Sequence, residues 1–363
     1  MFFTILIAVL SLIGLFIIHE LGHFLMAKKL GVRVEEFGIF FPPRLIGKKI
    51  GGTIYSLNLI PFGAFVRIYG EEEKAVSPES FSSRPIWQRF LIVLAGVLSF
   101  WLVAIILLSI VFHLGTAQII SDEENGFLTN PQVQIISVSS NSPASAAGLM
   151  PGDVIRYLGL KDQTEKLAVT KVKEVQEFVN QHRGEEVVLT IERKKDLFEV
   201  ILTPRVEPPA DEGALGVGLV RTAEKSYPIF QSFYKGIVAT IALTGDIILA
   251  LFNVLIKLIS GQGLPQGAQL VGPIGIGSLV VQAVQVGLNY FLQFIALLSI
   301  YLAIFNLLPI PALDGGKLLF LGIEKIKGRP INQGLEKKIT AAFFILLIIL
   351  MIWVTIKDIS RLF

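Results

Sequence analysis

Four long apolar runs stand out along the chain. They are Phe2–Met26, Phe90–Leu114, Tyr290–Leu308 and Ile339–Ile356. A helix needs about 20 residues to cross a hydrocarbon layer about 30 Å thick, so three of these runs are long enough, and the fourth is shorter but almost unbroken. Only 17% of the residues are charged, against about 25% in soluble proteins. The pattern therefore predicts an α-helical integral membrane protein with four transmembrane helices.

Lysine and arginine gather in two of the segments between these runs, residues 27–89 and 315–338. Basic loops tend to stay on the cytoplasmic side of a membrane, so both segments are expected there. The long segment 115–289 is then extracytoplasmic, because a folded domain of that length is translocated regardless of its charge. The net charge of +3 is small and forms no basic stripe, so nucleic acid is not expected as a partner.

Two segments between the runs show strand patterns. Residues 50–70 are rich in β-branched and aromatic residues interrupted by Gly and Pro, which predicts a membrane-associated β-sheet. Residues 131–206 combine strand patterns with a helical stretch at 170–182, which predicts an inserted α+β domain. The flanking residues 115–130 and 207–228 are expected to be linkers, and the second is rich in proline and acidic residues.

Residues 229–289 are apolar enough for a further crossing, yet their polar residues favour another arrangement. Polar residues recur at helical intervals and form one stripe: Lys235, Asp246, Asn253, Lys257 and Ser260. A lipid-facing aspartate is unfavourable, and a fifth crossing would invert the later loops, so we expect amphipathic helices on the extracytoplasmic surface. The complete expected order is transmembrane helix 1 (1–26), cytoplasmic loop (27–89), transmembrane helix 2 (90–114), linker (115–130), α+β domain (131–206), linker (207–228), amphipathic helices (229–289), transmembrane helix 3 (290–314), cytoplasmic loop (315–338) and transmembrane helix 4 (339–357).

The first apolar run contains His19-Glu20-Leu21-Gly22-His23, which matches the pattern H-E-x-x-H. Two histidines four residues apart project from the same face of a helix and can bind one metal ion. Zinc fits, because imidazole is a good ligand for it, and its bound water reaches a pKa of about 7. Glu20 can accept a proton from that water. A chance match or a hydrogen-bonded histidine pair is less favoured, because three ionisable residues inside an apolar span are unfavourable without a function.

A third zinc ligand is expected from Asp314, which lies three residues after Pro311 in the sequence NLLPIPALDGG. With the N-terminus outside, His19 lies 17 residues beyond Phe2, about 26 Å along the helix and near the cytoplasmic side, where the third run also ends. The two prolines break the helix, which is tolerated at membrane depth only where backbone is buried in protein or lines a wet cavity. Alone, this aspartate is equally typical of a turn. Together with the first motif, ligation is the better interpretation.

These motifs resemble the site-2 protease family of intramembrane zinc metalloproteases, and within it the bacterial RseP-type branch. The likeness covers nearly the whole chain: HELGH, IPFGAFVRIYGEE, the PDZ-like SPASAAGLMPGDVI, VGPIGI and NLLPIPALDGG. The resemblance implies zinc bound by His19, His23 and Asp314, with Glu20 as the catalytic base. It also implies a multi-pass protein of the bacterial inner (cytoplasmic) membrane, with its active site towards the cytoplasm and its PDZ domain outside. Its substrates would be single-span membrane proteins, such as anti-sigma factors or signal-peptide remnants, trimmed first by a site-1-type protease.

One departure from the family pattern lies in the second run. The family often has Gly-Pro-x-x-Asn there, whereas residues 96–100 are GVLSF, so Phe100 replaces the amide expected to contact substrate or oxyanion. Asn306 is the candidate replacement. Residues 53–69 are either an edge strand that binds an extended substrate or an ordinary hairpin. Residues 213–220 are either a carboxylate-binding loop or a flexible linker, and the PDZ-like domain either binds peptide termini or only gates access.

Two rival functions fit the sequence less well. A non-catalytic adaptor with a structural zinc site would have no use for Glu20, because such a site is closed by four protein ligands. A metal transporter would need polar groups along a continuous path, and the second and fourth runs offer almost none. A zinc metalloendopeptidase is therefore the expected function.

Overall fold

The computed structural model describes residues 2–71, 77–124, 128–161, 165–193, 196–209, 212–263 and 271–362. The chain forms two compact units. Unit 1 comprises Met1–Val111 and Pro228–Phe363, and unit 2 comprises Phe112–Tyr227. Each unit has its own hydrophobic core. Unit 2 is thus an insertion within the chain of unit 1, as the sequence predicts for the α+β domain.

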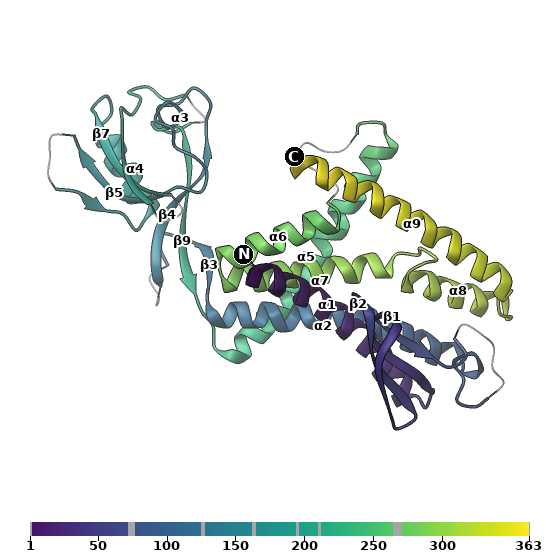
Figure 1. The fold of residues 1–363 in the computed structure, drawn as a ribbon. Coiled ribbons are helices and arrows are strands. Elements are labelled where there is room, and N and C mark those ends of the chain that lie inside the picture. The colour runs from purple at the N-terminus through teal and green to yellow at the C-terminus, as the bar shows by residue number, and fades with distance from the viewer. Residues whose placement is uncertain are drawn as a thin grey trace. The chain divides into compact units, whose positions relative to one another are not determined.

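Unit 1 is mainly helical (Figure 1). Its helices are α1 (Phe2–Lys29), α2 (Ile86–Leu114), α5 (Ile229–Ile259), α6 (Pro273–Val286), α7 (Leu288–Leu307), α8 (Asp314–Lys327) and α9 (Gln333–Leu362), with one 3-10 turn, η1 (Phe81–Ser83). In the described part of the chain, five helices are long and apolar enough to cross a membrane: α1, α2, α5, α7 and α9. Four of them correspond to the four predicted runs, of which only Leu308 lies outside its helix, and α5 is the additional candidate.

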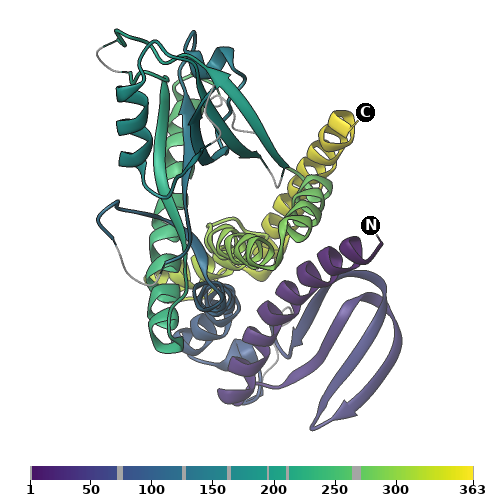
Figure 2. The same ribbon diagram turned by 90° about the vertical axis from the view of Figure 1, so that its left-hand side faces the viewer.

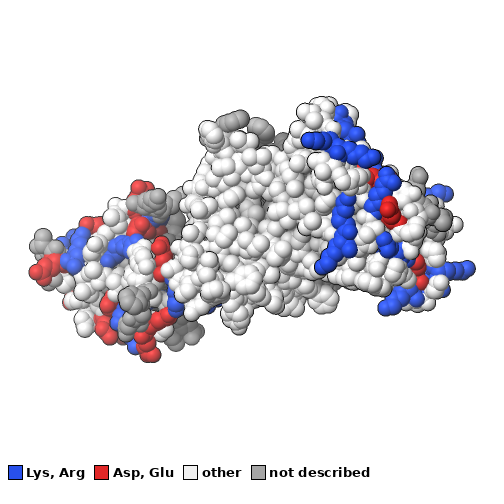
Figure 3. All heavy atoms as spheres, turned by 90° about the horizontal axis from the view of Figure 1, so that it is seen from below, with Lys and Arg blue, Asp and Glu red and all other residues white. Residues whose placement is uncertain are grey.

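The surface of unit 1 separates charged from uncharged regions. On the face shown in Figure 3, Lys and Arg side chains gather at the end of unit 1 where Figure 1 places α8 and the sheet between α1 and α2. The neighbouring helical surface is nearly free of charge. An uncharged belt beside a basic end is the surface expected of a multi-pass membrane protein.

The chain between α1 and α2 forms a β-sheet from β1 (Val34–Ile50) and β2 (Thr53–Ile68). Both strands bend, so that each supplies two segments of the sheet. Residues 36–39 of β1 pair on one side with 64–67 and on the other with 54–57 of β2. The predicted β-region, residues 50–70, therefore began too late, because charged residues and a Pro-Pro pair hide the strand pattern of β1.

The four segments have a definite order across this sheet. It is 60–68, 34–41, 53–58 and 44–50. Residues 53–58 are therefore interior, whereas 60–68 form an edge with no further strand partner among the described residues. Of the predicted substrate edge, residues 53–69, only the second half is available for strand addition.

The chain after α7 departs from the predicted third transmembrane helix, residues 290–314. α7 ends at Leu307, and Asp314 is the first residue of α8, a separate helix within the predicted loop 315–338. Pro309 and Pro311 explain the break, because proline lacks a backbone N–H and clashes with the preceding turn. Asp314 therefore opens a new helix and does not close the third apolar one.

Unit 2 is an antiparallel sheet with two short helices. Its elements are β3 (Thr116–Ile120), β4 (Thr129–Val138), α3 (Pro143–Ala146), β5 (Val154–Leu160), β6 (Leu167–Ala168), α4 (Val172–Gln181), β7 (Val187–Arg193), β8 (Asp196–Leu202) and β9 (Val217–Lys225). The strand order is β3-β9-β4-β5-β7-β8, with β6 beside β5. Aliphatic residues of the central strands, such as Ile135, Ile155 and Leu189, pack against Val175 and Val179 of α4. The helix predicted at 170–182 is confirmed.

Both predicted linkers of unit 2 contain strands. Residues 115–130 include β3, and residues 207–228 include β9, which pairs with β3 and with β4. Ala214 and Leu215 are buried in the core of the unit, so the interpretation of 213–220 as a flexible linker is wrong. Its carboxylate-binding role stays a prediction.

Candidate metal centre

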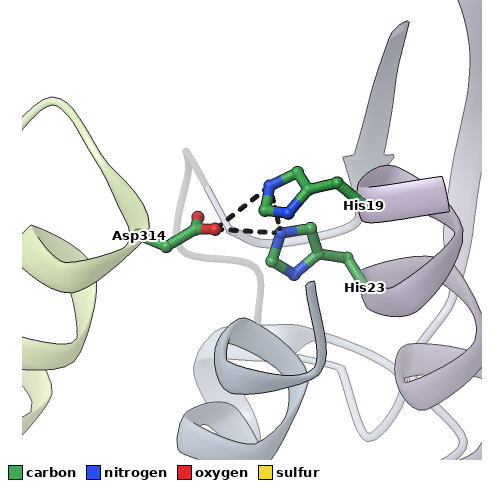
Figure 4. A group of neighbouring side chains, drawn as sticks. All are labelled: His19, His23 and Asp314. Carbon is green, nitrogen blue, oxygen red and sulfur yellow. Dashed lines mark hydrogen bonds and ion pairs between the residues drawn. The ribbon is translucent and has the colours of Figure 1, made fainter. Parts of the chain in front are cut away.

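Three side chains from distant parts of the sequence converge in unit 1. His19 and His23 project from successive turns of α1 towards Asp314 at the start of α8 (Figure 4). The Nε2 atoms of the two histidines are 3.3 Å apart, and Asp314 Oδ2 lies 3.2 Å from the first and 3.3 Å from the second. All three residues are buried. The structure therefore brings together the three residues that the sequence predicts to share one metal ion.

The triangle formed by these atoms has the size required for zinc. In a tetrahedral site, the distance between two ligand atoms is about 1.63 times the metal–ligand bond, so bonds of about 2.0–2.1 Å place the ligands about 3.3 Å apart. The three observed separations, 3.2, 3.3 and 3.3 Å, agree with this value. Two imidazoles and one carboxylate also leave the fourth position for water, as in catalytic zinc sites.

The hydrogen bonds around the triangle support a bound cation. His23 Nδ1 lies 2.9 Å from the carbonyl oxygen of Ile92 on α2. A carbonyl only accepts, so Nδ1 carries a proton, as a histidine that binds a metal ion through Nε2 requires. Asp314 Oδ2 is buried and receives no hydrogen bond from the described residues. A metal ion at the centre of the triangle would supply a partner for this buried oxygen.

A close approach between α1 and α2 holds the histidines in place. A Cβ atom on Gly22 would lie 2.5 Å from the carbonyl oxygen of Ala95, and a Cβ atom on Gly96 would lie 2.1 Å from His23 Nε2. Both distances are shorter than carbon–oxygen or carbon–nitrogen contacts allow. Only glycine therefore permits this packing at either position.

Gly96→Ala is expected to lower zinc affinity, because the new methyl group would overlap the ligand atom of His23. We expect a loss of about 10- to 100-fold, the range typical of perturbed ligand orientation. Gly14→Ala is the matched control, since a Cβ atom there meets no atom within 4 Å. Zinc retained after dialysis, measured by mass spectrometry, compares the two variants. Equal retention in both would show that the contact is unimportant.

The two glycines after Asp314 fit the tight turn before α8. A Cβ atom on Gly315 would lie 2.1 Å from the carbonyl oxygen of Leu308, and one on Gly316 would lie 2.3 Å from that of Ile310. The turn can fold back onto itself only because these positions lack side chains. The turn directs the carboxylate of Asp314 towards α1. Because Asp314 lies in the first turn of α8, its negative charge is also stabilised by the N-terminal end of that helix.

Three further residues bear on the surroundings of the triangle: Phe100 and Lys317, whose contacts were not predicted from the sequence, and Asn306, which was a predicted candidate. Phe100 is fully buried, and its ring stacks on that of His19 with the two ring centroids 4.7 Å apart. Asn306 Nδ2 donates to the carbonyl oxygen of Leu302 in its own helix at 2.9 Å, so this contact does not direct it towards the triangle. Lys317, one turn after Asp314, pairs with Glu71 at 2.6 Å. The basic residue within the LDGGK sequence was the available signal for this last contact.

The comparisons with known proteins agree with this geometry. The model of peptidase family M50 matches residues 7–350. A candidate zinc metalloprotease of Clostridium perfringens is 34% identical over 356 residues, 98% of each chain. The regulator of sigma-W protease RasP of Bacillus subtilis is 29% identical over an alignment that covers 100% of both chains. With a family model spanning almost its whole length and full-length relatives, the chain belongs to peptidase family M50, the site-2 proteases, and is a multi-pass membrane zinc metalloprotease.

Proposed function

We propose that the chain hydrolyses peptide bonds in or beside the transmembrane segments of other membrane proteins. The observation that carries this proposal is the zinc-sized triangle of His19, His23 and Asp314 in unit 1, whose surface otherwise resembles a membrane-spanning bundle. These three residues are the proposed zinc ligands. Bound zinc supplies a water molecule with a pKa near 7 at a site where peptide hydrolysis needs a nucleophile.

Glu20 is the proposed general base. It follows the first ligand directly and is only partly buried. Its carboxylate lies close enough to interact with the charges of His19, His23, Asp314 and Lys317. A carboxylate beside the metal ligands can take a proton from water and later give it to the leaving amine. Asn306 is a proposed contact of the substrate or oxyanion, because its Nδ2 has a second N–H besides the one donated to Leu302.

The substrate is proposed to bind as an added strand on residues 60–68. Peptide bonds in a helix are shielded by their own hydrogen bonds, so the segment to be cut must be extended. The free edge offers main-chain hydrogen bonds to any sequence. A pocket of about 260 Å³ lies beside it, lined by residues that include Phe41, Phe65 and Glu71. Single-span membrane proteins such as anti-sigma factors or signal-peptide remnants are the proposed substrates, after an upstream site-1-type cleavage.

The place where the proposed ligands meet supports four crossings. His19 lies in the second half of α1, and Asp314 follows the end of α7, so their contact places the ends of α1 and α7 on the same side. α2 runs back, so α7 must start on the side where α2 ends. If α5 crossed, α6 would have to return, yet its 14 residues span only about 21 Å. We therefore propose four crossings, by α1, α2, α7 and α9.

α5 and α6 are then proposed to lie at the extracytoplasmic surface. α5 runs steeply across α7 in both views (Figures 1 and 2). Its polar stripe, including Asp246, Asn253 and Lys257, is exposed, as expected of an amphipathic surface helix. The basic end of unit 1 is proposed to face the cytoplasm of a bacterium across its inner membrane. Unit 2, as a PDZ domain, would be extracytoplasmic and meet substrates there.

Metal removal provides the test of this function. We expect the purified chain in lipid vesicles to cut a single-span reporter, to lose this activity with 1,10-phenanthroline, and to regain it on addition of zinc. The isomer 1,7-phenanthroline, which does not chelate, is the control. Gel analysis of the reporter gives the result. Cleavage that persists after zinc has been removed would contradict the proposal.

A further inference from the structure

An ion pair between Glu71 and Lys317 links the end of the edge segment 60–68 to α8, the helix that carries Asp314. The edge segment 60–68 ends three residues before Glu71. Glu71 Oε1 accepts a hydrogen bond of 2.6 Å from Lys317 Nζ. Lys317 lies one turn after Asp314 on α8. Lys317 and Glu71 are 246 residues apart in the sequence. The contact therefore joins the proposed substrate strand to the proposed metal site.

One member of the Glu71–Lys317 ion pair lines the pocket beside the edge segment, and the other lies near the candidate metal centre. Glu71 lines the pocket beside the edge strand, together with residues 65–68. The Lys317 ammonium is close enough to interact electrostatically with Asp314 and Glu20 as well as with Glu71. Leu318, the next residue of α8, packs against the core formed by Phe24 of α1 and the inner face of the sheet. Movement of the edge strand along α8 would thus disrupt this ion pair directly.

A second ion pair anchors α8 without involving the sheet. Arg89 of α2 donates to both carboxylate oxygens of Glu324 on α8, at 3.0 and 2.5 Å. This pair fixes the later part of α8 to the helix bundle. It therefore provides an internal comparison: it stabilises the same helix but makes no contact with the edge strand.

Strand addition alone leaves the register of a bound peptide open. Main-chain hydrogen bonds repeat every two residues, so a peptide can shift by two residues and present the same face to the sheet. Such a shift moves a given peptide bond by about 6.6 Å. The bond that is cut therefore depends on how far the edge strand lies from the catalytic residues.

We propose that the Glu71–Lys317 ion pair is a positioning contact that holds the edge strand at a fixed distance from the metal site and so selects the peptide bond that is cut. The proposal rests on the function proposed above. Neither residue needs to touch the reacting atoms. Lys317 acts through α8, and Glu71 acts through the strand that it follows.

The test uses the full chain in vesicles and a single-span reporter whose products are identified by mass spectrometry. Lys317→Met or Glu71→Gln is expected to spread cleavage from one principal bond to bonds two residues away. The exchange Glu71→Lys with Lys317→Glu is expected to restore the principal bond. Glu324→Gln is the matched control, and it should change the yield without moving the bond.

A second readout does not depend on turnover. The chain contains no cysteine, so Val66→Cys in a Glu20→Gln background can be crosslinked to single cysteines along the reporter. We expect one reporter position to crosslink when the ion pair is intact and several when Lys317→Met is added. Unchanged cleavage and crosslinking positions would overturn the role of the pair while leaving the protease function intact. A shift of equal size in Glu324→Gln would also overturn it. Failure of the unmodified chain to cut any reporter would instead contradict the function itself.

Discussion

Glu20→Gln is expected to abolish cleavage of a membrane-embedded reporter while leaving about one zinc ion per chain. The amide cannot accept a proton at neutral pH, and general acid–base catalysis typically contributes about 10²- to 10⁴-fold. The ligand triangle does not include Glu20, so metal binding should survive. Cleavage rate and zinc content, measured on one preparation, separate the two effects.

Glu177→Gln is a suitable control for this substitution, because Glu177 is an exposed residue of α4 in unit 2. Glu177→Gln makes the same chemical change outside unit 1, and the variant protein should cleave the reporter at the normal rate. If Glu20→Gln retained normal cleavage, another group would have to be the base. If it lost zinc as well, the residue would act on the metal site and not on the proton.

Asp314→Asn is expected to cause the second large effect, in which bound zinc and cleavage of the reporter are lost together. The substitution replaces an anionic ligand with a neutral amide at nearly the same volume, so packing should change little. The buried site would then lack the negative charge that offsets the charge of zinc. Zinc retention after dialysis and the cleavage rate at saturating zinc are the measurements.

Asp246→Asn supplies the matched control for the ligand substitution. Asp246 is exposed on α5 and is not part of the three-residue group that can hold a metal. Its replacement should leave zinc content unchanged. Retention of zinc in Asp314→Asn equal to that in Asp246→Asn would exclude Asp314 as a ligand.

The local parts of the metal centre were accessible from the sequence. The spacing of His19 and His23 fixes both rings on one face of a helix, because four residues make just over one turn. Asp314 could be added because its place after an apolar run implied the same membrane depth as His19. The 3.2 Å contact between them agrees with that reasoning.

The parts that escaped prediction depend on distant pairing. β3 and β9 lie in segments interpreted as linkers, and they form strands because they pair with each other across about a hundred residues. β1 contains the buried residue Glu36. Burial alone would raise the pKa of its carboxyl, but Arg44 and Arg67 pair with it, and the pKa is lowered below its usual value. A charged residue of this kind interrupts the hydrophobic alternation that marks a strand. No local pattern reveals its partners.

The role of Phe100 could not have been read from the sequence either. Comparison with the family pattern indicated a missing asparagine, whereas the structure places an aromatic ring against His19. This contact packs the ring of His19, a proposed zinc ligand, against an apolar side chain, which restricts the orientation of the ring. For α5, which has the composition of a transmembrane helix, the polar stripe in the sequence argues against a crossing, and the meeting of α1 with the end of α7 adds an argument that the sequence alone could not supply.

X-ray absorption spectroscopy of the purified, zinc-loaded chain tests whether one zinc ion is shared by α1 and α8. We expect about one zinc per chain, with two imidazole nitrogens and oxygen ligands at about 2.0–2.2 Å. We also expect the loss of one imidazole signal in His23→Ala. A zinc shell without imidazole, or a shell unchanged by His23→Ala, would contradict a zinc ion shared in this way.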